Sequence, residues 1–318
     1  MVKTTTINSQ DDLIRDFFST FQEYRIFKQK AFYMGKNADV YYQLSSKRME
    51  DFFSTEETYY LFLKENILQK GKKVAFISLG CGNAEKELHI LKLMKRDGYD
   101  AVFVAVDSSE DMIGLAKKTF EKENFDVQFV CADFSSPEFF DKFSERIVGC
   151  DFSIYTFLGA TFGNVEQSYM ADIIFDLLNP GDKLWLEVVA RDETTKKDAL
   201  HFFEKYYAWL SNDTVKNFLN GPLKELGIKP ENGEIYLQMI EEDYLKSLKF
   251  VFRLKIKKKT VIHYQGKTTV LLPDNVIDLM TIRAYDAEGL VGFFKERNFQ
   301  FIAQKKAQGM GQFLFEKK

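Results

Sequence analysis

One short stretch constrains the fold of this 318-residue chain more than any other. Residues 74–79 (VAFISL) form an apolar run, which leads into a turn at residues 80–82 (GCG) and then into residues 83–86 (NAEK), where a helix can begin. Such a run needs neighbours on both faces, as in a parallel sheet, and Gly80 and Gly82 allow the backbone to approach a ligand at the carboxyl end of the strand. The stretch therefore predicts a parallel α/β sheet with a ligand-binding turn.

This turn lacks the third glycine of a dinucleotide fingerprint. In G-x-G-x-x-G the last glycine packs helix against strand, so that a pyrophosphate can sit on the helix N-terminus. Glu85 stands at that position. A carboxylate there repels a pyrophosphate but tolerates a cation, and S-adenosylmethionine carries a sulfonium and has no phosphate. We therefore expect S-adenosylmethionine rather than NAD, while an ordinary tight turn remains the alternative for G-x-G alone.

Acidic residues follow the next two predicted strands. The apolar residues 101–106 end at Asp107, about 20 residues after the turn, where an acid can accept hydrogen bonds from both ribose hydroxyls. Residues 127–130 lead to Asp133 and Phe134, which can bind the adenine amino group and cover the base. Each acid alone could be a helix cap, but their common register favours a nucleoside pocket.

Composition bounds the possible partners and location. The formal net charge is only −3, from 44 basic and 47 acidic residues mixed along the chain, so no field favours nucleic acid or a membrane surface. Cys81, Cys131 and Cys150 show neither metal-ligand spacing nor a secreted disulfide framework, and no signal peptide or membrane-spanning run is recognisable. We expect a cytoplasmic protein without a metal.

The order of predicted elements indicates a Rossmann-like sheet with an insertion. Strands and helices alternate over 73–188, and a late helix and an antiparallel strand pair return to the sheet after residue 284. Between them we expect helices over 197–211 and 213–226, the second broken by Gly221 and Pro222, and long antiparallel strands over 247–283. The strands expected in the first part are 74–79, 101–106, 127–130, 151–156 and 183–188, and those expected at the end are 299–303 and 312–315.

A loop after the fourth of these strands carries a specific resemblance. Residues 157–164 (FLGATFGN) resemble the F-P-G-S-T-I-G-N loop of the histidine-specific methyltransferases of ergothioneine biosynthesis. Residues 79–86 (LGCGNAEK) resemble the L-G-S-G-x-x-x-K element of that family, and residues 31–58 resemble its N-terminal Y-F-Y-D motif region. The similarity spans residues 30–318.

This resemblance implies a class I methyltransferase sheet of seven strands and a second, α+β substrate domain that closes over an amino-acid substrate. The corresponding segments are 1–62 (N-terminal part of the substrate domain), 63–190 (the S-adenosylmethionine-binding domain), 191–283 (the insertion that completes the substrate domain) and 284–318 (the final helix and strands of the sheet).

The resemblance also implies residue roles. Tyr33 and Gly159 are expected near the methionine end of the cofactor, and Asn164 is expected to face the substrate and, with Tyr33, to help position it. For Lys86 a surface position on the helix is the alternative, and for Asn164 the alternative is a turn and N-cap. The residues expected to line the rest of the cofactor are Gly80, Gly82, Lys86, Asp107, Asp133 and Phe134.

Two departures from the family motifs concern the substrate. The family's E-Y-Y-P falls on residues 51–54 (DFFS), so a phenylalanine, Phe53, replaces the tyrosine expected to help hold an imidazole. The late E-x-S-x-K-[FY] element places Met280 at the acid and Ile282 at the serine. A site that lacks its hydrogen-bonding groups discriminates against histidine, so a more apolar or aromatic amine fits better.

The sequence thus predicts an S-adenosylmethionine-dependent N-methyltransferase for the amine of an amino acid or a small molecule derived from one. The substrate contacts expected are Phe53, Phe162, Asn164, Met280 and Ile282, with Tyr33, Phe53 and Phe162 either forming a cation-π wall or belonging to the core. Proton removal falls to Asp286, to Glu187 or to solvent. A protein or peptide N-methyltransferase and a non-catalytic S-adenosylmethionine sensor remain alternatives.

Overall fold

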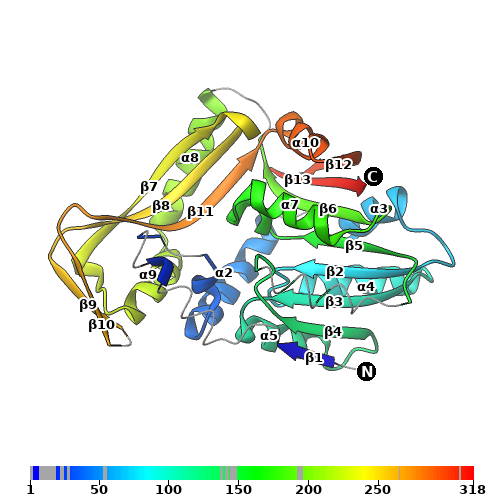
Figure 1. The fold of residues 1–318 in the computed structure, drawn as a ribbon, viewed down its shortest axis with the longest axis horizontal. Helices are drawn as coiled ribbons and strands as arrows, with labels where there is room; N and C mark the ends of the chain where they lie inside the picture. The colour runs from blue at the N-terminus through cyan, green and yellow to red at the C-terminus, as the bar shows by residue number, and fades with distance from the viewer. Residues whose placement is uncertain are drawn as a thin grey trace.

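The structure is a computed structural model that describes residues 3–6, 19–21, 25–26, 29–52, 56–136, 139, 143, 149–191, 196–264, 266–307 and 309–318. Within these ranges one mixed sheet of 11 strands crosses the molecule, and a two-stranded ribbon projects at one end (Figure 1). The fold is mixed α/β, as the alternation of apolar runs and helices predicts.

The larger part of the sheet has the predicted seven-stranded form. Five parallel strands lie in the order β4-β3-β2-β5-β6, β13 runs antiparallel along β6, and β12 pairs with β13. The predicted closing antiparallel pair is thereby confirmed. The strands are β2 (Lys73–Leu79), β3 (Asp100–Asp107), β4 (Asp126–Cys131), β5 (Phe152–Phe157), β6 (Lys183–Ala190), β12 (Phe299–Ala307) and β13 (Met310–Lys317), with β1 (Lys3–Thr6) beside β4.

Helices cover both faces of this sheet, because successive residues of its buried strands point to opposite sides. On β2, Val74 and Phe76 pack in one hydrophobic cluster, whereas Ala75 and Ile77 pack in another. The first face is covered by α3 (Glu56–Asn66), α4 (Glu85–Arg96) and α5 (Glu110–Phe120), and the second by α7 (Gln167–Leu177) and α10 (Ala287–Lys295).

A second group of elements continues from the carboxyl end of β6. There Val189 and Ala190 pair with Ala284 and Tyr285 of β11, which begins an antiparallel extension in the order β11-β8-β7. Its elements are α8 (Lys196–Leu210), α9 (Asp213–Glu225), η4 (Pro230–Asn232), β7 (Gly233–Glu242), η5 (Asp243–Leu245), β8 (Ser247–Ile256), the ribbon β9 (Thr260–Tyr264) and β10 (Lys267–Leu271), and β11 (Val276–Tyr285).

The predicted break in the second helix of this group is wrong, because α9 continues through Gly221 and Pro222. A proline cannot donate to the carbonyl four residues earlier, which is that of Phe218. Asn37 Nδ2 donates to this carbonyl instead, at 3.1 Å, and a Cβ at Gly221 would overlap the Asn37 side chain. Gly221 and Pro222 together therefore allow the Asn37 side chain to pack and hydrogen-bond against α9.

The N-terminal segments lie in two places. The helices η1 (Gln29–Tyr33) and α2 (Lys36–Phe52) pack against α9, in the second group, whereas β1 and α3 lie with the parallel sheet. The division into four domain segments remains a prediction. Among the described helices, none is both long enough and apolar enough to cross a membrane.

Candidate functional site

The turn after β2 brings the backbone to an open space. Gly80 and Gly82 have φ of 77° and 56°, and the turn leads into the first residues of α4. A Cβ at Gly80 would lie 2.7 Å from Thr161 Cγ2, whereas a Cβ at Gly82 would meet no atom within 4 Å. The first glycine therefore allows the loop after β5 to approach, and the second faces open space.

Asp107 lies at the end of β3, directly beside this turn. Its Oδ2 accepts from Gly82 N and its Oδ1 from Ser109 N, both at 3.0 Å. Burial raises the pKa of Asp107 to about 6, against the backbone N–H groups that favour its ionised form. Each carboxylate oxygen has more than one lone pair, so Asp107 can still accept from a ligand hydroxyl.

Asp133, which follows β4, already holds a cation. Its Oδ2 lies 2.6 Å from Lys30 Nζ, and its Oδ1 accepts from Ser135. Burial opposes the charge of Asp133, but Lys30 and Ser135 together hold its pKa below the ordinary value. The adjacent Phe134 is partly buried, with its ring 5.7 Å from that of Phe157.

The N-terminal segment extends over this edge of the sheet. Besides the contact made by Lys30, the Tyr33 carbonyl accepts from Ser109 Oγ at 2.5 Å, and Gly35 N donates to Asp111 at 2.7 Å. These contacts bring Tyr33 next to the loop that follows β3. Its ring belongs to an aromatic cluster with Tyr41 and Phe218, in which the ring centroids are 4.7–5.9 Å apart.

Lys86 points into the protein. Its Nζ lies 2.7 Å from Glu187 Oε2 and 3.2 Å from the Tyr59 hydroxyl, and the residue is buried, so the surface alternative is wrong. Glu187 Oε2 also accepts from Gly159 N at 2.5 Å. Burial raises the pKa of Glu187 to about 8, against the Gly159 N–H, which favours the ionised form, as does the nearby Lys86 ammonium. An isolated acid in the apolar run of residues 184–190 is the signal in the sequence that Glu187 needs a polar partner, but it does not say which residue that partner is.

Asn164 ends the short helix η3 (Thr161–Asn164), which follows β5. The N-cap of the next helix is Glu166, whose side chain accepts from Ser168 N and Tyr169 N, so the capping alternative for Asn164 is wrong. The Asn164 side chain is half-buried and forms no hydrogen bond with the part of the chain that the structure describes. Its amide is thus available to a ligand.

The remaining substrate candidates are placed differently. Phe162 is fully buried among Phe157, Tyr285 and Phe294, so it belongs to the core and a substrate contact does not fit. Met280 and Ile282 lie on β11 and pack in the same hydrophobic cluster as Tyr33 and Tyr41. Phe53 lies outside the described residues. Of the two candidate bases, Glu187 is fully buried, and Asp286 caps α10 through Gly289 N.

Comparison with protein families decides the assignment. Residues 14–201, more than half of the chain, match the family described as "Histidine-specific methyltransferase, SAM-dependent". The chain belongs to this family. It is an S-adenosylmethionine-dependent methyltransferase. Among curated protein sequences, none matches the chain.

Solved structures of low sequence identity resemble this methyltransferase. An S-adenosylmethionine-dependent methyltransferase from Clostridium acetobutylicum has 12% identity and a TM-score of 0.45, covering 87% of this chain and 98% of its own. A protein from Pyrococcus horikoshii has 17% identity and a TM-score of 0.44, covering 88% and 94%. The 1,6-didemethyltoxoflavin-N1-methyltransferase from Burkholderia thailandensis, solved with bound 1,6-didemethyltoxoflavin and S-adenosylhomocysteine, has 10% identity and a TM-score of 0.46, covering 88% and 85%.

The residues of the methyltransferase fit S-adenosylmethionine. Added Cβ atoms at Gly82 and Gly159 would both face open space, and Asp107 lies directly beside the first of these glycines. Glu187 Oε1 is buried without a hydrogen-bond partner among the described residues, which leaves an acceptor close to Gly159 for an N–H donor. When bound, the cofactor supplies a methyl group attached to a positively charged sulfur.

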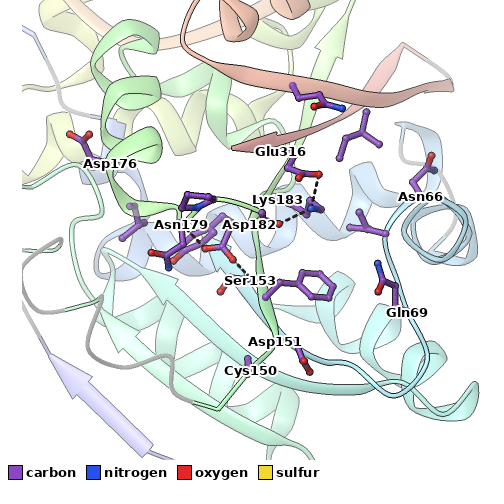
Figure 2. A pocket seen from close by; sticks show the side chains of 18 of the residues that line it. Asn66, Gln69, Cys150, Asp151, Ser153, Asp176, Asn179, Asp182, Lys183 and Glu316 are labelled. Atoms are coloured by element: carbon purple, nitrogen blue, oxygen red, sulfur yellow. Dashed lines mark hydrogen bonds and ion pairs between the residues drawn. The ribbon is translucent and has the colours of Figure 1, made fainter. Parts of the chain in front are cut away.

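A separate hollow lies at the opposite edge of the sheet, where β5 and β6 begin (Figure 2). Its volume is about 1210 Å³. Lys183 pairs with Glu316 at 2.8 Å, and Asp182 accepts from Ser153 N and Asn179 N at 2.7 and 2.9 Å (Figure 2). These contacts hold the strand beginnings to the closing hairpin, far from the carboxyl edge that carries Asp107.

Proposed function

We propose that this enzyme is an N-methyltransferase for the amine of an amino acid or a small molecule derived from one, with an aromatic or apolar side group. The observation that carries the proposal is the apolar character of β11, which lies against both η3, where Asn164 is, and η1 of the N-terminal segment. Where the family motif has an acid and a serine, this chain has Met280 and Ile282, which pack in the same cluster as the Tyr33, Tyr41 and Phe218 rings. Apolar side chains at these positions favour an apolar acceptor over histidine.

The cofactor is proposed to bind along the carboxyl edge of the parallel strands. Asp107 is suited to the ribose hydroxyls and Asp133 with Phe134 to the adenine, since these residues follow adjacent strands. Gly159 follows β5, and Tyr33 contacts Ser109 after β3. Both are suited to the methionine part. Gly80, Gly82 and Lys86 complete the proposed set, with Lys86 acting through Glu187 and the Gly159 backbone.

The acidic side chains on and near β11 already form ion pairs or cap a helix. Asp278 pairs with Arg253 at 2.7 Å, Glu242 pairs with Arg283 at 2.8 Å, and Asp286 caps α10. An acceptor amine therefore finds no free carboxylate from these residues and is proposed to bind in its neutral form. A neutral amine already has the lone pair that methyl transfer requires, so proton loss to solvent suffices.

The proposed contribution of the protein is positioning. Methyl transfer from a sulfonium is an in-line displacement, in which alignment of the two reacting atoms lowers the barrier. The Asn164 amide can orient the polar part of the acceptor, and the aromatic cluster can hold its apolar part and stabilise a methylated ammonium. Residues 30–42 contact the proposed cofactor edge through Asp133, Ser109, Asp111 and Glu85, and are proposed to help exclude water.

The test is S-adenosylhomocysteine release by the purified protein, given S-adenosylmethionine and a panel of acceptors. The panel contains histidine, tryptophan and other aromatic amino acids, the corresponding decarboxylated amines, and short peptides. The proposal expects turnover on an aromatic or apolar amine, little on histidine, and loss of turnover in Asn164→Ala with cofactor binding retained. Preferred methylation of histidine or of peptides would overturn it.

A further inference from the structure

A buried arginine holds the loop that carries Asn164. Arg283 lies on β11, is 7% exposed, and donates from Nη1 to the carbonyls of Gly163 and Val165, each at 3.2 Å. These are the two residues that flank Asn164 in the chain. One nitrogen thus fixes the backbone on both sides of the proposed substrate contact.

The arginine is itself held in place. Its Nε donates to Glu242 Oε2 at 2.8 Å and its Nη2 to Glu242 Oε1 at 3.3 Å, which is the bidentate geometry that orients a guanidinium most firmly. Glu242 also accepts from Ser247 Oγ at 2.8 Å. Although burial opposes its charge, the contacts with Arg283 and Ser247 hold the pKa of Glu242 below the ordinary value, so the pair is ionised at neutral pH.

The loop and the strand are fitted to one another at this point. A Cβ at Gly163 would lie 3.4 Å from Arg283 N, so the absence of a side chain allows the loop to rest on the strand backbone. From the other side, Gln167 Nε2 donates to the Val165 carbonyl at 2.7 Å and to the Phe162 carbonyl at 3.2 Å. The Asn164 side chain makes none of these contacts, so the loop is held while the amide stays available.

We infer that Arg283, anchored by Glu242, is a positioning residue that sets the orientation of Asn164 toward the methyl acceptor. This inference rests on the proposed role of Asn164. Met280 and Ile282 of β11 lack the polar groups of the family motif. The strand therefore influences the acceptor through Arg283 and the backbone of the loop that carries Asn164.

The experiment compares Arg283→Met with a matched control, Arg253→Met. Arg253 also forms a bidentate pair with a carboxylate on β11, through Asp278, but touches neither Gly163 nor Val165. Arg283→Met is expected to lower kcat/KM for the acceptor by about 10- to 100-fold, as small misplacements of a substrate-positioning group do. The affinity for S-adenosylmethionine is expected to stay close to that of the parent, and Arg253→Met is expected to leave both quantities unchanged.

A double-mutant cycle with Asn164→Ala separates positioning from a general structural role. If Arg283 acts through Asn164, Arg283→Met causes no further loss of acceptor kcat/KM once the amide is gone. An equal loss in both backgrounds would overturn the inference. If Asn164→Ala leaves the acceptor kinetics unchanged, the proposed substrate contact fails and the inference with it, whereas a loss in Asn164→Ala alone overturns only the inference.

Two milder variants keep the test decisive if Arg283→Met does not fold. Arg283→Lys retains the charge but cannot reach Glu242 and both carbonyls together, and Glu242→Gln weakens the anchor while keeping its shape. Both are expected to raise the KM for the acceptor more than that for S-adenosylmethionine. Equal changes in the two KM values, or none, would contradict the positioning role.

Discussion

Lys86 Nζ lies 2.7 Å from Glu187 Oε2, and both side chains are buried. The pair joins α4, which follows the glycine turn, to β6, and the same carboxylate oxygen accepts from Gly159 N. One acid therefore connects the turn after β2 with the loop after β5. These are the two backbone segments between which the cofactor is proposed to lie.

Removing Lys86 leaves Glu187 buried without its side-chain hydrogen-bond partner. We expect Lys86→Met to lower the free energy of unfolding by about 1–3 kcal/mol, and the double variant Lys86→Met/Glu187→Leu to recover much of that loss. Denaturant unfolding measures both values. The exposed pair of Lys72 and Asp151 is the control, since Lys72→Met is expected to cost less than about 1 kcal/mol. A single and a double variant of equal stability would contradict the pairing.

The pKa of Asp107 predicts a pH dependence of cofactor affinity. Burial raises this pKa to about 6, and ribose hydroxyl donors favour the ionised carboxylate. Affinity is therefore expected to be constant well above pH 6 and to fall about tenfold for each pH unit below it. In the unliganded protein the raised pKa affects stability instead. Because the pKa of Asp107 is higher in the folded than in the unfolded chain, its contribution to the free energy of unfolding falls as the pH rises from about 4 through 6.

Calorimetric titration with S-adenosylmethionine across this pH range tests the expectation. Asp107→Asn is the control, since an amide cannot ionise; it should bind more weakly and lose the step near pH 6. If the wild type shows no step there while the variant binds equally well, Asp107 does not contact the cofactor.

The two glycines of the turn are expected to respond differently to alanine. Both have positive φ, so each substitution costs about 1–2 kcal/mol of stability. At Gly80 the added Cβ also meets Thr161 Cγ2 at 2.7 Å, and Thr161→Ser, which removes that methyl group, should recover part of the loss. At Gly82 the Cβ enters open space, so the larger loss is expected in S-adenosylmethionine affinity. Thermal unfolding and equilibrium binding distinguish the two, and equal binding losses at both sites would contradict the assignment.

The sequence predicted those parts of the fold whose signals are local. The apolar runs gave the five parallel strands within two residues, and Asp107 and Asp133 follow adjacent strands as expected. The pairing of Lys86 with Glu187 could not be predicted, because the partners are 101 residues apart and no local pattern links them. Likewise, Pro222 predicted a helix break because the compensating donor, Asn37, belongs to another helix.

The aromatic cluster predicts how the acceptor site responds to changes at Tyr33. Its ring lies 4.7 Å from that of Tyr41 and 5.9 Å from that of Phe218, and its carbonyl contacts the cofactor edge through Ser109. If the ring stabilises the amine or its methylated product, Tyr33→Leu should raise the acceptor KM by about 2- to 30-fold, corresponding to about 0.5–2 kcal/mol for a cation-π contact.

Tyr33→Phe keeps the ring and should retain most of the affinity. Steady-state kinetics at saturating S-adenosylmethionine measure the effect, with Tyr207→Leu, which changes an exposed tyrosine of α8, as the control. An equal rise in Tyr33→Phe and Tyr33→Leu would assign the contact to the hydroxyl instead of the ring.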